Sequence, residues 1–107
     1  MKRIERTARA SADIDTAVDR YLEIAGPDVA RRFLAEYDSA LAHITRHPGT
    51  GSPRYARMGE GTPLRHWMLK RFPHSVFYVA REKTILIVRV LQQASDIGTR
   101  LLDPDLD

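Results

Sequence analysis

Cysteine is absent from all 107 residues of the chain. Its absence excludes a disulfide scaffold, a thiolate metal site and a cysteine nucleophile. No apolar run approaches the ~18 residues of a membrane-spanning helix. The opening residues, MKRIERTARA, also have no apolar core of the kind that a signal peptide carries. We therefore expect a cytoplasmic protein that makes no contact with a membrane.

Recognisable catalytic motifs are missing as well. The GxSxG, P-loop, GxGxxG and HExxH patterns do not occur. His43 and His47 have a spacing that suits a metal on one face of a helix, but no third ligand stands at a diagnostic distance. Acidic residues are scarce between residues 51 and 92, which disfavours a pair of catalytic carboxylates. The sequence therefore predicts no catalytic residue, no metal site and no cofactor.

Length and composition indicate one globular domain over residues 1–107. The chain has a mass of 12.2 kDa, and hydrophobic residues make up 43% and charged residues 29%. These fractions are ordinary for a folded protein, and a chain of this size buries enough surface for one core.

Charge is distributed unevenly along the chain, whose formal net charge is +3. Residues 1–50 are balanced, residues 51–92 carry eight basic and two acidic residues, and residues 93–107 carry four aspartates and one arginine. A basic block favours an anionic partner, either nucleic acid or an acidic protein segment. The alternative is a solvated arginine-rich surface with no partner.

Residues 8–47 have the spacing of two amphipathic helices. In the first, about residues 8–25, Thr7 or Ser11 is the candidate N-cap, and Gly26 is the candidate left-handed C-cap. Pro27 suits the first turn of the second helix, and Pro48 ends it. Because the linker is one or two residues, we expect an antiparallel helical hairpin. The apolar positions of the first helix follow a 3.6-residue period: Ala10, Ile14, Ala17, Val18, Tyr21 and Leu22.

The remainder of the chain changes to the pattern of strands. Residues 64–69, 75–81 and 84–91 are rich in β-branched and aromatic side chains, and Glu82 and Lys83 form a gap of hairpin-turn length. Residues 2–7 suit an edge strand, and ILIVRVL at 85–91 suits a central one. Residues 48–63 read as irregular. Residues 94–102 have room for one or two helical turns, and residues 103–107 read as a frayed acidic tail.

The element order is thus β-α-α-β-β-β. It predicts an α+β fold in which the N-terminal helical hairpin packs on one face of a mainly antiparallel sheet. The other face of this sheet is expected to be polar or covered by a partner.

Several cations stand out within the strands. Arg89 lies among six apolar residues and, by the period of two, shares a face with Ile85, Ile87 and Leu91. Such an arginine serves either an internal ion pair or an anion contact. Arg65 and Trp67 alternate on one strand and project from the same face, which suits stacking on a partner or, alternatively, a core Trp with an edge Arg.

Three segments together resemble the ParE toxins of the RelE/ParE superfamily, over nearly the whole chain. They are TARASADIDTAVDRYLEIAGPDVARRFL at 7–34, HPGTGSPR at 47–54 and PLRHWMLKRFPHSVFYVAREKTILIVRVL at 63–91. The resemblance implies a bacterial type II toxin that inhibits growth and is neutralised by a cognate antitoxin. Similar toxins poison DNA gyrase, whereas their RelE relatives cut mRNA on the ribosome.

One departure from the family pattern bears on chemistry. Many members follow the RVL triplet with His and an Arg-Asp pair, whereas this chain has Gln92 and Ser95-Asp96 there. Gln92 has no titratable group and cannot act as a general base. Tyr78 and His66 are then the nearby candidates for acid–base work, and Tyr78 fits a packing role better.

We therefore interpret the chain as a toxin that binds gyrase without chemistry of its own. The alternatives are a RelE-type ribosome-dependent mRNA endonuclease and a non-toxic basic module that binds nucleic acid or protein. The expected oligomer is a homodimer or a toxin–antitoxin hetero-oligomer. The residues predicted to contact the target or the antitoxin are Arg54, Arg65, Trp67, Lys70, Arg71, Arg81 and Arg89.

Overall fold

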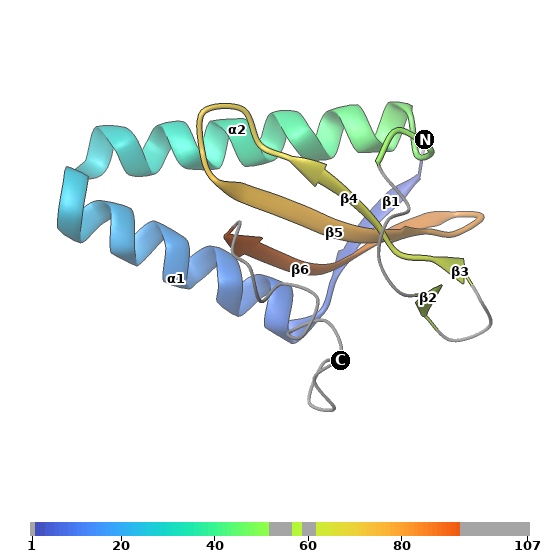
Figure 1. Cartoon of the computed structure of the whole chain (residues 1–107). Coiled ribbons are helices and arrows are strands. Elements are labelled where there is room, and N and C mark those ends of the chain that lie inside the picture. The colour runs from blue at the N-terminus through green and yellow to red at the C-terminus, as the bar shows by residue number, and fades with distance from the viewer. Residues whose placement is uncertain (1, 52–56, 59–61, 93–107) are drawn as a thin grey trace.

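A helical hairpin lies across one face of a four-stranded sheet in the computed structural model, which describes residues 2–51, 57–58 and 62–92 (Figure 1). The predicted α+β fold and the β-α-α-β-β-β order of the main elements are confirmed. The elements are β1 (Arg3–Arg6), α1 (Ala8–Ala25), α2 (Pro27–Arg46), β2 (Arg57–Met58), β3 (Thr62–Pro63), β4 (Arg65–Met68), β5 (His74–Ala80) and β6 (Thr84–Gln92).

The helical hairpin begins at Thr7, which is the N-cap of α1. The Ala10 N–H donates to Thr7 Oγ1 over 3.0 Å, and this hydroxyl donates to the Val88 carbonyl over 2.7 Å. Gly26 has the positive φ of 92° that favours glycine, but its ψ of 175° lies outside the left-handed helical region, so the predicted left-handed cap is wrong. The ring of Pro27 disfavours a helical ψ in the residue before it, which accounts for the extended value.

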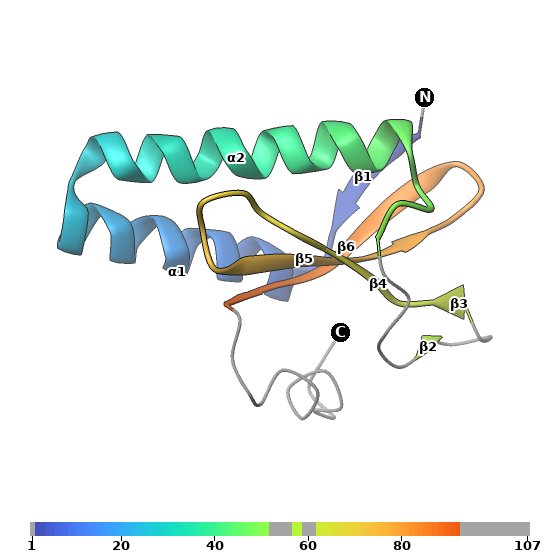
Figure 2. The ribbon, with the colours of Figure 1, turned by 45° about the horizontal axis from the view of Figure 1, so that its top comes forward.

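The sheet has the strand order β1-β6-β5-β4, with β1 parallel to β6 and the other neighbours antiparallel. The predicted hairpin joins β5 to β6, and the Arg81 N–H donates to the Thr84 carbonyl over 2.8 Å. Lys2 Nζ donates to the carbonyls of Arg81 and Glu82 in this turn. Lys2, just before β1, is thereby held beside a turn some 80 residues further along the chain, and Figure 2 shows the start of β1 near this turn.

An irregularity in the pairing of β5 with β6 alters the side-chain alternation. Phe77 pairs with Arg89 but Tyr78 pairs with Ile87, so Val88 is an extra residue on β6. As a result Ile85 and Ile87 pack in the cluster beneath the helices, whereas Leu91 belongs to the cluster on the other face. The expectation that these residues share one face with Arg89 is wrong, because a bulge breaks the period of two.

Two apolar clusters lie on the two faces of the sheet. The larger one joins the sheet to both helices through buried residues such as Phe33, Ile44 and Tyr78. The face away from the helices was expected to be polar or covered by a partner, and this is wrong. It carries a cluster of five apolar residues that are at most 3% exposed within the chain itself: Leu64, Phe77, Val79, Val88 and Leu91.

The segment between α2 and β4 is only partly irregular. β2 and β3 pair antiparallel over two residue pairs, on the side of the sheet away from the helices (Figure 2). Two-residue strands are too short to leave a period in the sequence, which is why this ribbon was not expected. The predicted turns at 94–102 and the predicted frayed end at 103–107 lie outside the described residues. Neither described helix has the length and apolarity that a membrane crossing requires.

Candidate partner-binding surface

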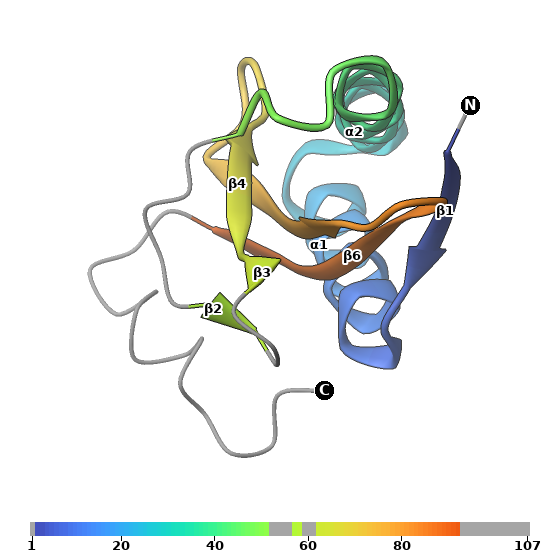
Figure 3. The ribbon, with the colours of Figure 1, turned by 90° about the vertical axis from the view of Figure 1, so that its right-hand side faces the viewer.

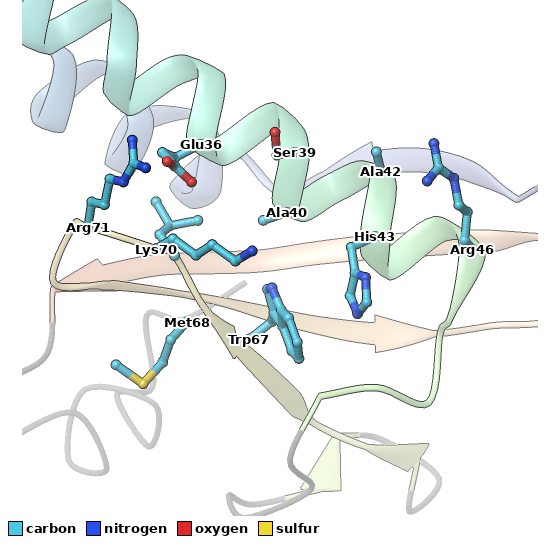
Figure 4. Close-up of a pocket in the computed structure, with 11 residues that line it drawn as sticks. Glu36, Ser39, Ala40, Ala42, His43, Arg46, Trp67, Met68, Lys70 and Arg71 are labelled. Atoms are coloured by element: carbon cyan, nitrogen blue, oxygen red, sulfur yellow. The ribbon is translucent and has the colours of Figure 1, made fainter.

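A groove of about 810 Å³ runs between α2 and β4 (Figure 4). One wall is the face of α2 that carries Glu36, Ser39, His43 and Arg46, and the other wall is β4 with the turn that follows it. We call this the α2–β4 groove. Because β4 is an edge strand, no other strand of the described chain lies on its outer side (Figure 3).

Small side chains on α2 keep the groove open. Ser39, Ala40 and Ala42 line it, so the helix presents little bulk toward β4 in its middle. The same helix is anchored below by Phe33, Tyr37 and Ile44, which are at most 3% exposed. One face of α2 is therefore buried in the core, and an adjacent face lines the groove beside the sheet.

An aromatic stack forms the floor of the groove. The rings of His43 and Trp67 lie 4.5 Å apart at 24°, and the two side chains lie face to face in Figure 4. His43 Nε2 is 3.0 Å from Thr50 Oγ1, which fixes the imidazole orientation. Trp67 is half-buried, so the indole retains an accessible surface inside the groove.

Cations outnumber acids along the groove. Arg46, Lys70 and Arg71 line it together with a single carboxylate, Glu36. All three cations are exposed, and none forms an ion pair with another residue of the described chain. Arg71 also has a φ of 68°, the left-handed conformation that L side chains adopt at a cost of about 1–2 kcal/mol.

Arg65 is bound to the loop that follows α2. Its Nη1 donates to the Gly51 carbonyl over 2.8 Å and to the Gly49 carbonyl over 3.3 Å. The prediction that Arg65 and Trp67 share a face of β4 fits their contacts, since Trp67 stacks on the helix adjoining this loop. Arg65 thus holds the loop after α2 against β4, and its predicted contact with a partner stays a prediction.

Tyr78 fixes the same loop from below. Its hydroxyl donates to the Pro48 carbonyl over 2.9 Å and accepts from the Gly51 N–H over 2.8 Å. A Cβ on Gly51 would lie 2.6 Å from this hydroxyl, so glycine is needed there for close approach. Burial raises the pKa of Tyr78, while the Gly51 hydrogen bond and Arg65 oppose the increase. Tyr78 is fully buried, as its predicted packing role requires.

Arg89 is paired inside the molecule. Its Nε lies 2.7 Å from Asp13 Oδ2, and its Nη2 lies 2.9 Å from Asp13 Oδ1. Asp13 Oδ2 also accepts from the Val90 N–H over 2.9 Å, on the side of β6 where the pairing with β1 has ended at Ile87. Both side chains are about 85% buried. Of the two roles open from the sequence, Arg89 therefore has the internal ion pair, and its predicted partner contact stays untested.

The structure brings together only part of the predicted set. Trp67, Lys70 and Arg71 lie in one groove, with Arg65 beside it. Arg81 lies at the β5–β6 turn, the opposite end of β5 from Lys70 and Arg71. Arg54 lies outside the described residues.

Sequence reasoning missed the residues that α2 contributes. Glu36, Ser39, His43 and Arg46 recur at three and four residues, which is one face of a helix. This polar stripe was the available signal, but it ran alongside the apolar stripe and His43 was considered only as a metal ligand. Within the described chain, no group of three His, Asp or Glu side chains is placed to hold a metal.

The two residues considered for acid–base chemistry lie on opposite faces of the sheet. Tyr78 packs in the cluster beneath the helices, whereas His66 stacks on Phe77, which belongs to the cluster on the other face. Gln92 is the exposed last residue of β6. These side chains therefore do not converge on one reacting atom.

Comparisons with known proteins identify the class. The family model described as "ParE toxin of type II toxin-antitoxin system, parDE" matches residues 4–97. The chain belongs to this family of type II toxins. A solved structure of the chromosomal ParDE toxin–antitoxin system from P. aeruginosa has the same fold. The two chains are 24% identical with a TM-score of 0.69, and the match covers 88% of this chain and 98% of the other. A search among curated proteins finds no match.

Proposed function

We propose that this toxin inhibits growth by binding DNA gyrase in the cytoplasm, and that a cognate antitoxin neutralises it by occupying the α2–β4 groove. Membership of the ParE family supports a toxin paired with an antitoxin. The similar fold of a chain from a ParDE system agrees with this pairing. The resemblance to gyrase poisons supplies the target.

The observation that carries the proposal is the pairing of an accessible aromatic floor with unmatched cations. Trp67 offers apolar surface, and Arg46, Lys70 and Arg71 offer positive charge that Glu36 only partly offsets. A partner segment that carries both apolar and acidic side chains fits such a groove, because each component of the groove then has a complement. The edge of β4 offers backbone groups to an extended segment in addition.

Binding agrees with the side chains better than catalysis does. His66 and Tyr78 lie on opposite faces of the sheet, and the Tyr78 hydroxyl is already bound to Pro48 and Gly51. Gln92 replaces the histidine that many members carry, so no base is supplied from that position. A toxin that acts by occupying a surface needs none of these groups.

A supercoiling assay with purified gyrase tests the target. The wild-type protein should inhibit supercoiling, and the double variant Lys70→Glu with Arg71→Glu should inhibit about tenfold more weakly because it reverses two groove charges. The matched control is Arg3→Glu with Lys83→Glu, which reverses two exposed cations, one on the opposite edge strand β1 and one in the adjoining β5–β6 turn. Uninhibited supercoiling at a large excess of wild-type protein would rule out gyrase as the target. Equal losses in both double variants would remove the groove from the contact.

Trp67 makes the antitoxin part testable directly, because it is the one tryptophan in the chain. The short acidic protein encoded beside the toxin gene is the antitoxin candidate, prepared without tryptophan. Its addition should change the Trp67 emission with a saturable dependence on concentration. Binding seen by calorimetry without any change in Trp67 emission would place the antitoxin elsewhere.

A further inference from the structure

A second, smaller pocket lies where side chains of α1 meet the first residue of β5 and the end of β6. Its volume is about 240 Å³, and it shares no residue with the α2–β4 groove. Polar side chains from three elements line it: Asp13, Thr16, Arg20, His74, Arg89 and Gln92. Its apolar lining includes Ala17, Val90 and Leu91.

The charges of this pocket leave one cation over. Both oxygens of Asp13 are bound, one to Arg89 Nη2 and the other to Arg89 Nε and the Val90 N–H. The carboxylate and the Arg89 guanidinium therefore match each other. Arg20 is exposed at the rim and forms no hydrogen bond or ion pair with the residues that the structure describes. Among the described residues, the positive charge of Arg20 is the one in this pocket without a counter-ion.

His74 adds a buried polar group without a partner. The side chain is 7% exposed and packs edge-on against Phe33 at 5.0 Å and Tyr21 at 6.0 Å. Its Nδ1 is buried and has no hydrogen-bond partner in the described chain. Burial and the nearby Arg20 lower the pKa of His74, and Asp13 opposes them. The neutral imidazole still carries one N–H donor. Buried polar groups without a partner are uncommon and call for an explanation such as a ligand.

We propose that this pocket binds the carboxylate of an acidic side chain from a partner protein. The Arg20 guanidinium supplies the charge and the geometry for two parallel hydrogen bonds. His74, Gln92 and Thr16 line the pocket as neutral polar side chains, and the neutral imidazole of His74 carries one N–H donor. One unmatched positive charge suits a monoanionic carboxylate better than a dianionic phosphate. Ala17, Val90 and Leu91 give the methylene groups of an aspartate or glutamate an apolar surface.

This site is independent of the proposed gyrase contact and of the α2–β4 groove. Asp13 and Arg89 have a supporting role in it, since their pairing holds the pocket wall and leaves the charge of Arg20 unmatched. A partner that fills both surfaces would contact the helical hairpin from two sides.

Acetate is the probe for this proposal, titrated into the full-length ¹⁵N-labelled protein at pH 7 and constant ionic strength. Chloride and inorganic phosphate are titrated in parallel. We expect saturable chemical-shift changes at Thr16, Arg20, His74 and Gln92 with acetate, and smaller changes with the other two anions. Arg20→Gln should weaken acetate binding at least about fivefold, because it removes the unmatched charge.

Two further variants make the result decisive. His74→Phe keeps an aromatic ring in the cluster but removes both nitrogens, and should also weaken acetate binding at least about fivefold. Arg32→Gln removes an exposed cation of α2 that does not line the pocket, and should bind acetate as the wild type does. Stronger shifts with phosphate, no saturable shifts, or equal affinities in Arg20→Gln and Arg32→Gln would each overturn the proposal.

Discussion

Arg89 and the pair Lys70–Arg71 are cations of the same sheet with opposite environments. Arg89 is about 85% buried and bound to both oxygens of Asp13, whereas Lys70 and Arg71 are exposed at the end of a groove without a carboxylate bound to them in the described chain. The sequence pattern left the role of Arg89 open between an internal ion pair and a partner contact, and all three cations were predicted to contact a partner. The comparison teaches that what matters for binding is whether a nearby element supplies a counter-ion.

The desolvation of charge explains the difference in physical terms. A guanidinium taken out of water loses its hydration, so it is tolerated only with a hydrogen-bonded partner, and Asp13 of α1 meets this need. At the β4–β5 turn no such helix residue is bound to the cations, and water solvates them. The first arrangement stabilises the fold, and the second leaves charge available to another molecule.

The largest expected change in stability comes from removing the ion-pair partner of Arg89. Asp13→Ala leaves a buried guanidinium and the Val90 N–H without their acceptor, and we expect the free energy of unfolding to fall by about 3 kcal/mol. Asp15→Ala, two residues further along α1, changes an exposed carboxylate and should stay within about 0.5 kcal/mol of wild type. Urea denaturation followed by circular dichroism measures both. Similar losses in the two variants would show that the Arg89–Asp13 pair has no special role.

Two glycine substitutions in the β4–β5 turn test whether the exposed cations contribute to stability. Arg71→Gly relieves the left-handed strain at φ 68°, and we expect the free energy of unfolding to rise by about 0.5 kcal/mol after the entropic cost of glycine. Lys70→Gly has no such strain to relieve and should lower it by about 0.5–1 kcal/mol. Thermal unfolding of the two variants gives the order directly. Destabilisation by Arg71→Gly would indicate that the Arg71 side chain stabilises the fold.

The smallest expected effect concerns His74, the uncharged neighbour of the Arg89 pair. Its pKa is lowered in the fold from the ordinary value of 6.5, so below pH 6.5 the unfolded chain binds a proton that the folded chain does not. Stability from this group is therefore fully present above pH 6.5 and is lost as the pH falls toward the folded-state pKa. His74→Phe should remove this part of the pH dependence, measured by urea unfolding at pH 7.5, 6.5 and 5.5. His47→Phe, at an exposed histidine, is the control, and a slope unchanged by His74→Phe would contradict the assignment.

The parts of the fold that were predictable are those set by local pattern. The apolar period placed both helices within two residues of their bounds, and Gly26-Pro27 fixed the hairpin between them. The three long strands followed from β-branched runs, and the β5–β6 turn from its length. The parallel pairing of β1 with β6 was not predictable, because it joins residues about 80 positions apart and neither strand specifies its neighbour in sequence.

The candidate site was predictable in its residue types and not in its grouping. Trp67, Lys70 and Arg71 lie within five residues of one another in sequence and remain together in the groove. Arg89 was separated from them by a bulge at Val88 and by Asp13, 76 residues away, neither of which leaves a local signal. The wall that α2 supplies depends on how the hairpin lies on the sheet, which no short-range pattern records.

The position of β1 has a consequence for biosynthesis. Among the described strands, β1 pairs only with β6, from Arg3 with Thr84 to Arg6 with Ile87, and hydrogen bonds of Lys2 and Thr7 extend the contact at both ends. The N-terminal residues of a nascent chain leave the ribosome first, so β1 stays unpaired until β6 has been translated and released. The four-stranded sheet therefore closes only after β6 has been synthesised, and a truncated product that stops before residue 84 would lack the strand with which β1 pairs.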